Sequence, residues 1–234
     1  MKAYWKRHTG AWIGLAIIAL WVLSLSVWLT IPVSFSSPWI YIGILVQTHL
    51  YTGLFITAHD AMHGVVSANR RVNKIIGFTA ALLFAYNWYP RLHRKHHQHH
   101  RFVATEEDPD YHKGGFLPWY ISFARQYVVI WQIVAMAATY HTLLLFFDRP
   151  NLILFWIIPS VLSTLQLFYF GTYLPHKGEH SENNKYKSRS QSKNHVIAFF
   201  TCYFFGYHYE HHASPATPWW KLWKVKEKFH THKS

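Results

Sequence analysis

The sequence has almost no sulfur ligands and few charged side chains. Cys202 is the only cysteine among the 234 residues, which excludes iron–sulfur clusters and other metal sites that need several thiolates. Charged residues make up 14% of the chain, whereas roughly 25% is usual in a soluble domain. Hydrophobic residues account for 51% and aromatic residues for 19%. This composition is typical of a protein embedded in a membrane.

The apolar residues are concentrated in four long runs. These runs cover residues 12 to about 31, 39–58, about 121–147 and 152–174. A helix needs about 20 consecutive apolar residues to cross the hydrocarbon core of a bilayer, and each run meets that length. We therefore expect an all-α integral membrane protein that forms one domain over residues 1–234, with about four transmembrane helices.

Two shorter apolar stretches, residues 75–89 and 196–207, fit a membrane surface better than a full crossing. Stretches of about 12 to 15 residues usually form buried, interfacial or re-entrant segments. Basic side chains flank the first stretch on both sides, and a crossing there would conflict with the preference for positive charge on the cytoplasmic side. The flanking basic residues are Arg70, Arg71, Lys74, Arg91, Arg94, Lys95 and Arg101.

The charge distribution also predicts orientation and location. With four spans, the nearly uncharged loops at residues 34–38 and 148–150 face away from the cytoplasm, and both termini are cytoplasmic. We expect the inner membrane of a bacterium or an equivalent internal membrane. The net charge of +13 suits anionic lipid headgroups, and residues 219–234 fit a segment on the cytoplasmic leaflet. Aromatic and basic residues do not alternate in a soluble patch, so we expect no nucleic-acid partner.

Histidine is abundant, and ten of the 19 histidines lie in three short clusters. The pattern H-x-x-H-H should occur by chance about 0.1 times in such a chain, yet it occurs three times, twice in overlapping registers. On a helix, residues three and four apart share a face, so each cluster can direct several ring nitrogens to one point. Imidazole suits iron, zinc, copper or nickel, whereas calcium and magnesium prefer oxygen. The clusters are His59 and His63; His93, His96, His97, His99 and His100; and His208, His211 and His212.

The three clusters predict one metal site at the cytoplasmic ends of the helices. Long apolar segments separate the clusters, so only the fold can bring them together. The middle cluster leaves two registers open. Both His93, His96 and His97 and the set His96, His99 and His100 satisfy the pattern, and periodicity alone does not choose between them.

Four motifs resemble those of bacterial beta-carotene ketolases in the membrane fatty-acid-desaturase-like superfamily. They are HDAMHG, KHHQHH followed by TEEDPD, LFYFGTYLPH and YHYEHHASPATPWW, and the resemblance extends from about residue 54 to residue 220. Members of this family carry K-H-x-x-H-H-R at a fixed distance before a D-P-D tripeptide. The resemblance therefore implies His96, His99 and His100 as ligands, with His93 and His97 as neighbours or alternates.

The resemblance also implies two iron ions held chiefly by neutral imidazoles. The superfamily usually adds a histidine after the last span, for which His176 is a better candidate than His180 or His195. The chain has only ten acidic residues, which agrees with imidazole rather than carboxylate ligands. The nine implied ligands are His59, His63, His96, His99, His100, His176, His208, His211 and His212.

Four acidic residues lie near these histidines in the sequence. Asp60 is a candidate acceptor for a ring N–H or a group that bonds at the helix end, and Glu210 is expected to orient a neighbouring imidazole. Asp108 and Asp110 are candidates for proton donors or for acceptors behind the ligands. The alternative is that they only form a turn around Pro109.

The implied reaction is an O2-dependent oxidation of ring carbon 4 of beta-carotene. Two successive hydroxylations and the loss of water would give a ketone, first as echinenone and then as canthaxanthin. The polyene would enter from the bilayer and lie in an apolar tunnel. The chain has no cysteine cluster and no nucleotide-binding glycine motif, so electrons must come from a separate donor such as ferredoxin. Candidate lining residues, which could equally form an aromatic belt, are Trp88, Tyr89, Trp119, Tyr120, Phe170 and Tyr173.

Two other functions stay open on the sequence. A fatty acyl desaturase or hydroxylase of the same superfamily would use such a metal site on a different lipid. A membrane metal transporter or sensor would use the clusters as a binding path, but it would need polar residues through the middle of several spans. Few such residues are there, namely Gln47, His49, Gln132 and Gln166.

Overall fold

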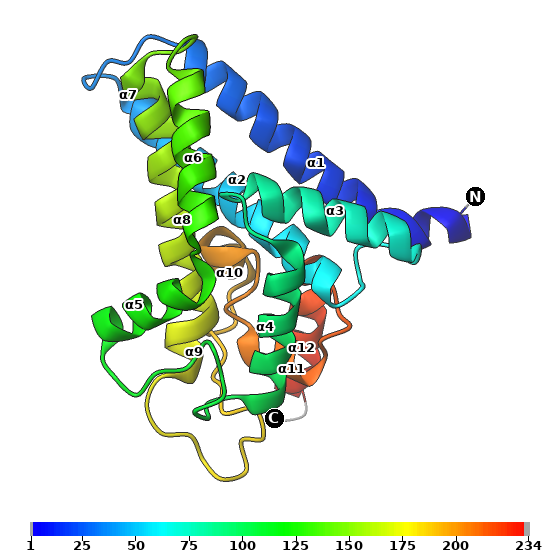
Figure 1. Cartoon of the computed structure of the whole chain (residues 1–234). Helices are drawn as coiled ribbons and strands as arrows, with labels where there is room; N and C mark the ends of the chain where they lie inside the picture. The colour runs from blue at the N-terminus through cyan, green and yellow to red at the C-terminus, as the bar shows by residue number, and fades with distance from the viewer. Residues whose placement is uncertain (1, 232–234) are drawn as a thin grey trace.

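The computed structural model describes residues 2–231, which form helices and loops and contain no strand. The expected all-α fold is confirmed for this part of the chain. In Figure 1, α1, α6 and α7 meet at one end of the molecule, whereas α4, α9, α11 and α12 lie toward the other end. The helices are α1 (Lys2–Thr30), α2 (Pro38–Met62), α3 (Arg70–Leu83), α4 (Tyr89–Phe102), α5 (Phe116–Tyr127), α6 (Ile130–Leu143), α7 (Arg149–Leu152), α8 (Ile158–Phe168), α9 (Leu174–His176), α10 (His195–Cys202), α11 (His208–Ala213) and α12 (Leu222–Thr231).

Three helices are long and apolar enough to cross a membrane. They are His8–Thr30, Pro38–Met62 and Arg149–His176, and they match the first, second and fourth apolar runs of the sequence. Helix α2 packs against α1, α3 and α8, and its buried residues include Gln47, Tyr51 and Leu54. Helix α2 also carries His59 in its last turn and is followed directly by His63, so this buried helix positions both histidines of the first cluster.

The third apolar run is not the straight helix that the sequence predicted. It is divided into α5 and α6, which meet at an angle of 83°. The backbone is extended at Val128 and Val129, and the Gln132 side chain accepts the Val129 N–H at 2.7 Å. Gln132 thus satisfies a backbone donor that the start of α6 leaves without a partner in the helix. At 1.5 Å per residue, the 14 residues of α6 extend roughly 21 Å, so only the bent pair together reaches the length of a span.

A buried asparagine fixes the turn that follows α2. Asn73 Oδ1 accepts the N–H groups of Val66 and Ser67 at 3.1 and 3.3 Å, and Asn73 Nδ2 donates to the Ala61 carbonyl at 2.8 Å. These bonds tie α3 to the end of α2. They therefore hold the chain on both sides of His63 in place.

The last long helix, Arg149–His176, contains two π-helical turns, η1 (Ile153–Ile157) and η2 (Tyr169–Tyr173). Such turns are rare and frequently lie at functional sites. A side chain at Gly171 in η2 would collide with the ring of Phe205, so glycine permits this helix to approach the segment before α11. The extra residue of the π turn also rotates the residues that follow, including His176, about the helix axis.

The two shorter apolar stretches and the C-terminal segment are helical as well. Helix α3 covers most of the first stretch and α10 part of the second. Tyr203 and Phe204 adopt left-handed backbone angles, with φ of 49° and 62°, and turn the chain from α10 toward α11. The C-terminal segment forms η3 (Trp219–Lys221) and α12, and the final residues 232–234 of the expected interfacial segment lie outside the described residues. Contact of these segments with a membrane surface stays a prediction.

Candidate metal centre

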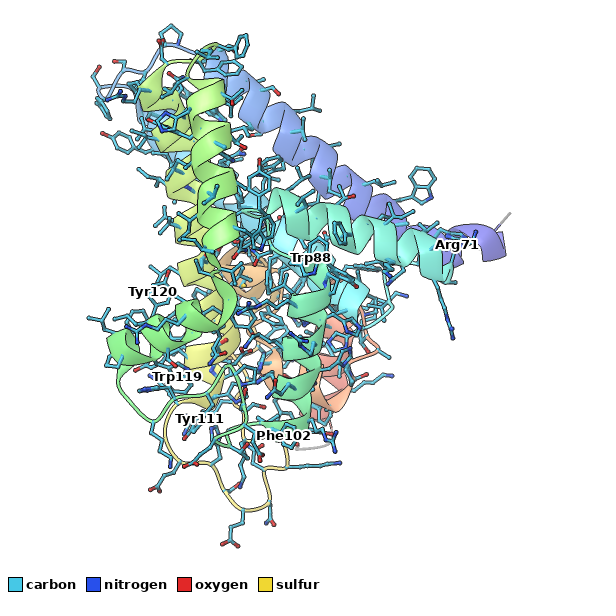
Figure 2. All side chains as sticks on the ribbon, viewed as in Figure 1. Arg71, Trp88, Phe102, Tyr111, Trp119 and Tyr120 are labelled. Atoms are coloured by element: carbon cyan, nitrogen blue, oxygen red, sulfur yellow. The ribbon has the colours of Figure 1, made fainter. Side chains whose placement is uncertain are left out.

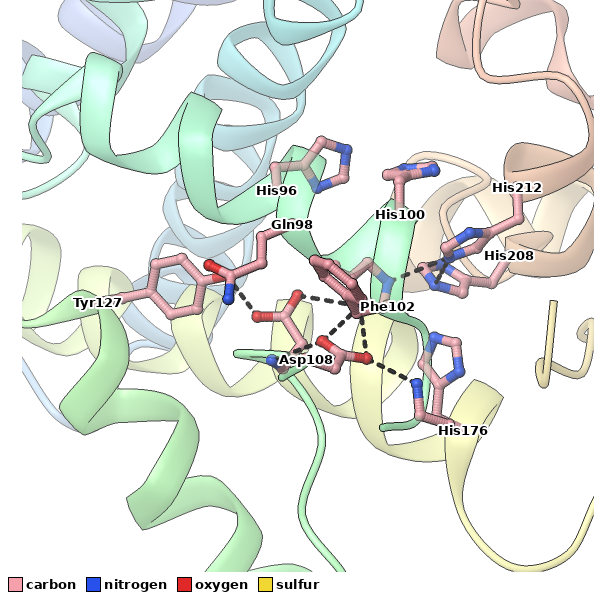
Figure 3. Close-up of polar contacts among 12 residues, drawn as sticks. His96, Gln98, His100, Phe102, Asp108, Tyr127, His176, His208 and His212 are labelled. Atoms are coloured by element: carbon pink, nitrogen blue, oxygen red, sulfur yellow. Dashed lines mark hydrogen bonds and ion pairs between the residues drawn. The ribbon is translucent and has the colours of Figure 1, made fainter. Parts of the chain in front are cut away.

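Nine histidines gather where α2, α4, α9 and α11 meet. Eight of them form two groups, and within each group the candidate ligand atoms lie within 4.8 Å of one another. Figure 3 shows His96 and His100 on α4 facing His208 and His212, with His176 approaching from α9. The first group is His59, His63, His96 and His211, and the second is His99, His176, His208 and His212.

The ninth histidine, His100, lies between the two groups. Its Nε2 is 2.9 Å from His211 Nε2 of the first group, and its ring centroid is 4.3 Å from that of His212 of the second. A similar approach occurs inside the first group, where the Nε2 atoms of His63 and His96 are 2.7 Å apart. Nitrogen atoms from separate helices therefore converge on two small regions.

Helix α4 brings one register of the middle cluster into the site. His96 and His99 are on its buried face, and His100 is half-buried beside them. His93 and His97 are exposed, and His97 Nε2 bonds to a backbone carbonyl of α2 at 3.2 Å. Residues on one side of a helix recur at three and four positions, so one helix turns three of the five histidines inward and leaves the other two outside.

Two of the histidines are oriented by a hydrogen bond on the far side of the ring. His99 Nδ1 donates to Asp108 Oδ1 at 2.9 Å, and His176 Nδ1 donates to the Lys187 carbonyl at 2.8 Å. Each bond favours the tautomer whose Nε2 carries a lone pair directed into the group. Asp108 is held in turn, because its oxygens accept two backbone N–H groups of its own loop at 2.9 Å.

Burial keeps most of these imidazoles uncharged. It lowers the pKa of His63 to about 3 and the pKa values of His96 and His208 well below their usual range. Burial alone would also lower the pKa of His99, but the hydrogen bond to Asp108 and the negative charges of Asp110 and Asp108 together outweigh burial and raise that pKa. Neutral imidazole is the form that binds metal, so the protein environment prepares the site for a cation.

The donor set fits a first-row transition metal in each group. His59 Nε2 and His176 Nε2 are buried without a hydrogen-bond partner within residues 2–231. A buried polar atom without a partner is costly, and a metal ion bound by the group would satisfy it. Since the converging donors are imidazole nitrogens, iron, zinc, copper and nickel suit them better than calcium or magnesium.

Asp60 and Glu210, which lie next to the candidate ligands in the sequence, make their main contacts with residues other than these histidines. Asp60 Oδ2 accepts a backbone N–H of the C-terminal segment at 3.0 Å, while Asp60 Oδ1 is 3.4 Å from His59 Nδ1. The sequence suggested that Glu210 orients a neighbouring imidazole, but its contacts in the structure are with other residues. Its carboxylate accepts a hydrogen bond from Ser190 Oγ at 2.5 Å and pairs with Lys226 Nζ at 3.2 Å. The histidines of α11 occupy its inward face, so the residue between them points elsewhere.

Asp110 contacts both the second histidine group and the neighbouring helix α5. Its Oδ2 is 3.8 Å from His99 Nδ1, and its carboxylate accepts a hydrogen bond from Tyr127. Its backbone carbonyl accepts the Trp119 Nε1–H at 2.7 Å. Burial raises the pKa of Asp110 to about 6. The loop of Asp108 and Asp110 is thus both a folded turn and a support for His99.

An apolar cavity of about 510 Å³ lies beside the histidines. Its wall includes His59 and His96 of the first group and His99 and His208 of the second. The volume is within the range of small-molecule pockets, roughly 300–1,000 Å³. An apolar molecule in this cavity would contact both histidine groups. Apolar side chains of its wall include Phe55, Phe84, Phe123, Met136, Leu167 and Phe205.

Of the six aromatic residues expected to line a tunnel, Tyr120 lies on the wall of this cavity and the others lie elsewhere. Trp88 is 48% exposed at the start of α4; Figure 2 labels it and Tyr120. A separate polar pocket is lined by Trp119 and Tyr173, whereas the hydrophobic core contains Tyr89 and Phe170. Sequence reasoning selected aromatic residues near the ends of spans, whereas the bend between α5 and α6 brings other residues to the wall.

Replacing Asp108 with alanine is expected to weaken metal binding by the second group roughly 10- to 100-fold. His99 would lose the acceptor that fixes its tautomer. Metal retained per chain can be measured after dialysis against increasing concentrations of a chelator. The control Asp108→Asn keeps an oxygen acceptor, so we expect it to lose much less metal. Equal retention by Asp108→Ala and the unchanged protein would show that Asp108 does not support the ligand.

Comparison with known proteins agrees with the motifs and the site. The profile of the fatty acid desaturase family matches residues 36–125 and 115–232, which is more than half of the chain. Beta-carotene 4-ketolase 3 of Haematococcus lacustris is 41% identical over 76% of this chain and 59% of its own length. The chain therefore spans about three fifths of that algal relative. No solved structure matches the chain.

Two bacterial relatives are covered more completely. The beta-carotene ketolase of Paracoccus sp. (strain PC1) is 41% identical over 77% of this chain and 76% of its own length. The beta-carotene ketolase of Paracoccus sp. (strain N81106 / MBIC 01143) is 36% identical over 93% of this chain and 88% of its own length. The chain therefore belongs to the fatty acid desaturase family, in the group of the beta-carotene ketolases.

Proposed function

We propose that this protein is a carotenoid ketolase that oxidises ring carbon 4 of beta-carotene. The observation that carries this proposal is the apolar cavity of about 510 Å³, whose wall contains histidines of both candidate metal groups. A hydrocarbon ring that enters it would lie beside both groups and be surrounded by apolar side chains. The names of the relatives supply the substrate class, since the three described above are beta-carotene ketolases.

Two iron ions are the metals that we propose for the site. The four histidines of each group would hold one ion, and His100 lies where it could serve either group. When bound, the iron pair supplies the activation of dioxygen. The chain positions the ring and keeps it in an apolar enclosure, because productive geometry depends on holding the reacting carbon close to the oxidant.

The proposed reaction takes two oxidation steps at one carbon. In each step a C–H bond becomes C–OH; one oxygen atom of O2 enters the product, and the other leaves as water with two electrons and two protons. The second step gives a carbon with two hydroxyl groups, which loses water to form the ketone. The products would be echinenone after one ring is oxidised and canthaxanthin after both. Asp108 supports His99 through a hydrogen bond, and Asp60 lies 3.4 Å from His59 Nδ1. Asp110 is on the cavity wall, and we propose that it also exchanges protons with the cavity.

We further propose that the protein lies in the inner membrane of a bacterium or an equivalent internal membrane. Three helices, or four if α5 and α6 form one bent span, have the required length and apolar character. The basic residues of α3 and α4 would place the histidine end and both termini in the cytoplasm. A separate electron carrier such as ferredoxin would then supply electrons from that side.

Pigment analysis in cells that make beta-carotene tests the proposed reaction. We expect cells that express the unchanged chain to form ketone-bearing carotenoids, which chromatography and mass spectrometry would detect. The variant His96→Ala is expected to form none, because His96 belongs to the first group. The control His93→Ala changes an exposed histidine of the same helix and should form ketones at nearly the unchanged level.

Two results would contradict the proposal. Unchanged beta-carotene in cells with folded, iron-loaded protein would exclude the ketolase and favour a fatty acyl substrate. Loss of ketones in His93→Ala with full activity in His96→Ala would reverse the assignment of the register in α4.

A further inference from the structure

The proposed ketolase must oxidise the same carbon twice. A polar group on the cavity wall could therefore hold the alcohol formed in the first step. After the first step, the ring carries a hydroxyl group, and the alcohol must keep its position beside the metals for the second step. A wall of apolar side chains alone cannot distinguish the alcohol from the hydrocarbon. A side chain with an available hydrogen-bonding group near the histidines could do so.

Most polar groups on the cavity wall already have a partner within the protein. Ser160 Oγ donates to the Ile157 carbonyl at 2.7 Å, and Thr164 Oγ1 donates to the Ser160 carbonyl at 2.9 Å. The Gln132 side chain donates to Asn87 Oδ1 at 2.9 Å, and the hydroxyl of Tyr127 donates to Asp110. The donor hydrogens of these four side chains are therefore already used in bonds within the protein.

Thr172 is different. It lines the same cavity and is only 5% exposed, yet its hydroxyl has no hydrogen-bond partner among the residues that the structure describes. A Thr hydroxyl can both donate and accept a hydrogen bond. The hydroxyl is therefore free to bind a polar group of a molecule in the cavity.

Thr172 shares the cavity wall with His99 and His208 of the second histidine group. Thr172 is in the π turn η2, and His176 follows it by four residues, about one helical turn. The absence of a side chain at Gly171 lets η2 approach Phe205, which is itself on the cavity wall. The turn that shapes the wall thus also presents the threonine to it.

Tyr120 is the other lining residue whose hydroxyl has no partner within the described chain. It is half-buried on α5, and its ring packs against Phe168 at a centroid distance of 5.2 Å. Helix α5 carries none of the nine histidines. A substrate group bound by Tyr120 would therefore be positioned by a helix without metal ligands. Thr172, in contrast, is on the helix that ends in the candidate ligand His176.

We propose that Thr172 binds the hydroxyl group of the ring alcohol formed in the first oxidation and holds carbon 4 in place for the second. This inference rests on the proposed ketolase function. One hydrogen bond of this kind favours the alcohol over the hydrocarbon by roughly two- to tenfold. Its loss should release the alcohol early, so that the second oxidation no longer follows the first on the same protein molecule.

The test compares Thr172→Val with Thr164→Val. Both substitutions remove a hydroxyl from the cavity wall and keep a branched side chain, but the hydroxyl of Thr164 is bound to a backbone carbonyl. We expect Thr172→Val to raise the ratio of ring alcohols to ketones roughly two- to tenfold in cells that make beta-carotene. Thr164→Val should leave this ratio unchanged, and Thr172→Ser should restore it.

A binding measurement separates this role from a general loss of activity. Purified, iron-loaded protein is titrated in the absence of oxygen and reductant with beta-carotene or with its ring-4 alcohol, and the visible absorption of the bound pigment is followed. Thr172→Val should weaken binding of the alcohol and leave binding of beta-carotene and the iron content unchanged. An equal effect on both pigments would overturn the proposal.

The remaining outcomes are also decisive. An unchanged product ratio in Thr172→Val would overturn the proposal, as would a shift in ratio produced by Tyr120→Phe and not by Thr172→Val. If the unchanged chain oxidises no carotenoid while it is folded and loaded with iron, the ketolase function itself fails, and the inference about Thr172 fails with it. A ketolase with an unaltered ratio in Thr172→Val instead refutes only the inference.

Discussion

Replacing His176 with alanine is expected to remove most of the metal from the second histidine group and to lower ketone formation at least about 100-fold. Mutations of groups that only support a ligand typically cost 10- to 100-fold in metal affinity or activity, and loss of a ligand should cost no less. His176 lies with His99, His208 and His212 in one group. Its Nε2 is buried without a hydrogen-bond partner within residues 2–231, so its lone pair is available for metal.

His180→Ala is the matched control for this prediction. His180 lies four residues later, is half-buried and bonds through Nε2 to the His176 carbonyl at 3.2 Å. We expect this variant to keep its metal and nearly all of its activity. Iron per chain and the yield of ketones are measured for both variants. If His180→Ala lost its metal while His176→Ala kept it, the assignment of the ligand after the last span would be wrong.

The sequence predicted the histidines of the site better than it predicted their surroundings. The spacing within each cluster is a local property of a helix, so His59 and His63, and His208 with its neighbours, could be selected without a structure. The choice between the two registers of α4 was different, because both satisfy the helical period. The resemblance to the ketolases selected one register, and the structure places His96 and His99 of that register on the buried face of α4.

The cavity could not be predicted in the same way. Its wall depends on the bend between α5 and α6, which is formed by two extended residues and a hydrogen bond from Val129 to Gln132. The apolar run across this bend looks like one continuous span, since hydropathy does not register a change of direction. Thr172 was also unremarkable in the sequence, because a single threonine in an apolar helix usually bonds to its own backbone. Only three-dimensional packing shows that its hydroxyl lacks such a bond.

The contacts of Glu210 show the same limit of local reasoning. Its place between His208 and His211 suggested that it would act on the metal ligands. The partner that the fold provides is Lys226, which is 16 positions away on α12. Such a pairing depends on the return of the C-terminal segment to α11, a long-range contact that no periodic pattern encodes.

Breaking this buried ion pair is expected to give the largest loss of stability among the substitutions considered. The side chains of Lys226 and Glu210 are 8% and 4% exposed, and their charged atoms are 3.2 Å apart. Removing one partner of a buried pair costs about 3–5 kcal/mol, because the other charge stays buried without compensation. At about 2–4 °C per kcal/mol for a chain of this size, Glu210→Ala should lower the unfolding temperature by roughly 6 to 20 °C. Thermal unfolding of the purified protein in detergent measures this shift.

Two further variants decide whether the charge itself is responsible. Replacing both partners by apolar residues, as in Glu210→Leu with Lys226→Met, removes the isolated charge, and buried pairs replaced in this way often lose little stability. The double variant should therefore unfold at a higher temperature than Glu210→Ala. Lys193→Met removes one partner of the exposed pair with Glu227, whose side chains are 41% and 40% exposed, and should change the unfolding temperature little because solvent screens that pair. If the double variant were as unstable as Glu210→Ala, the loss would come from packing around α11 rather than from an unpaired lysine.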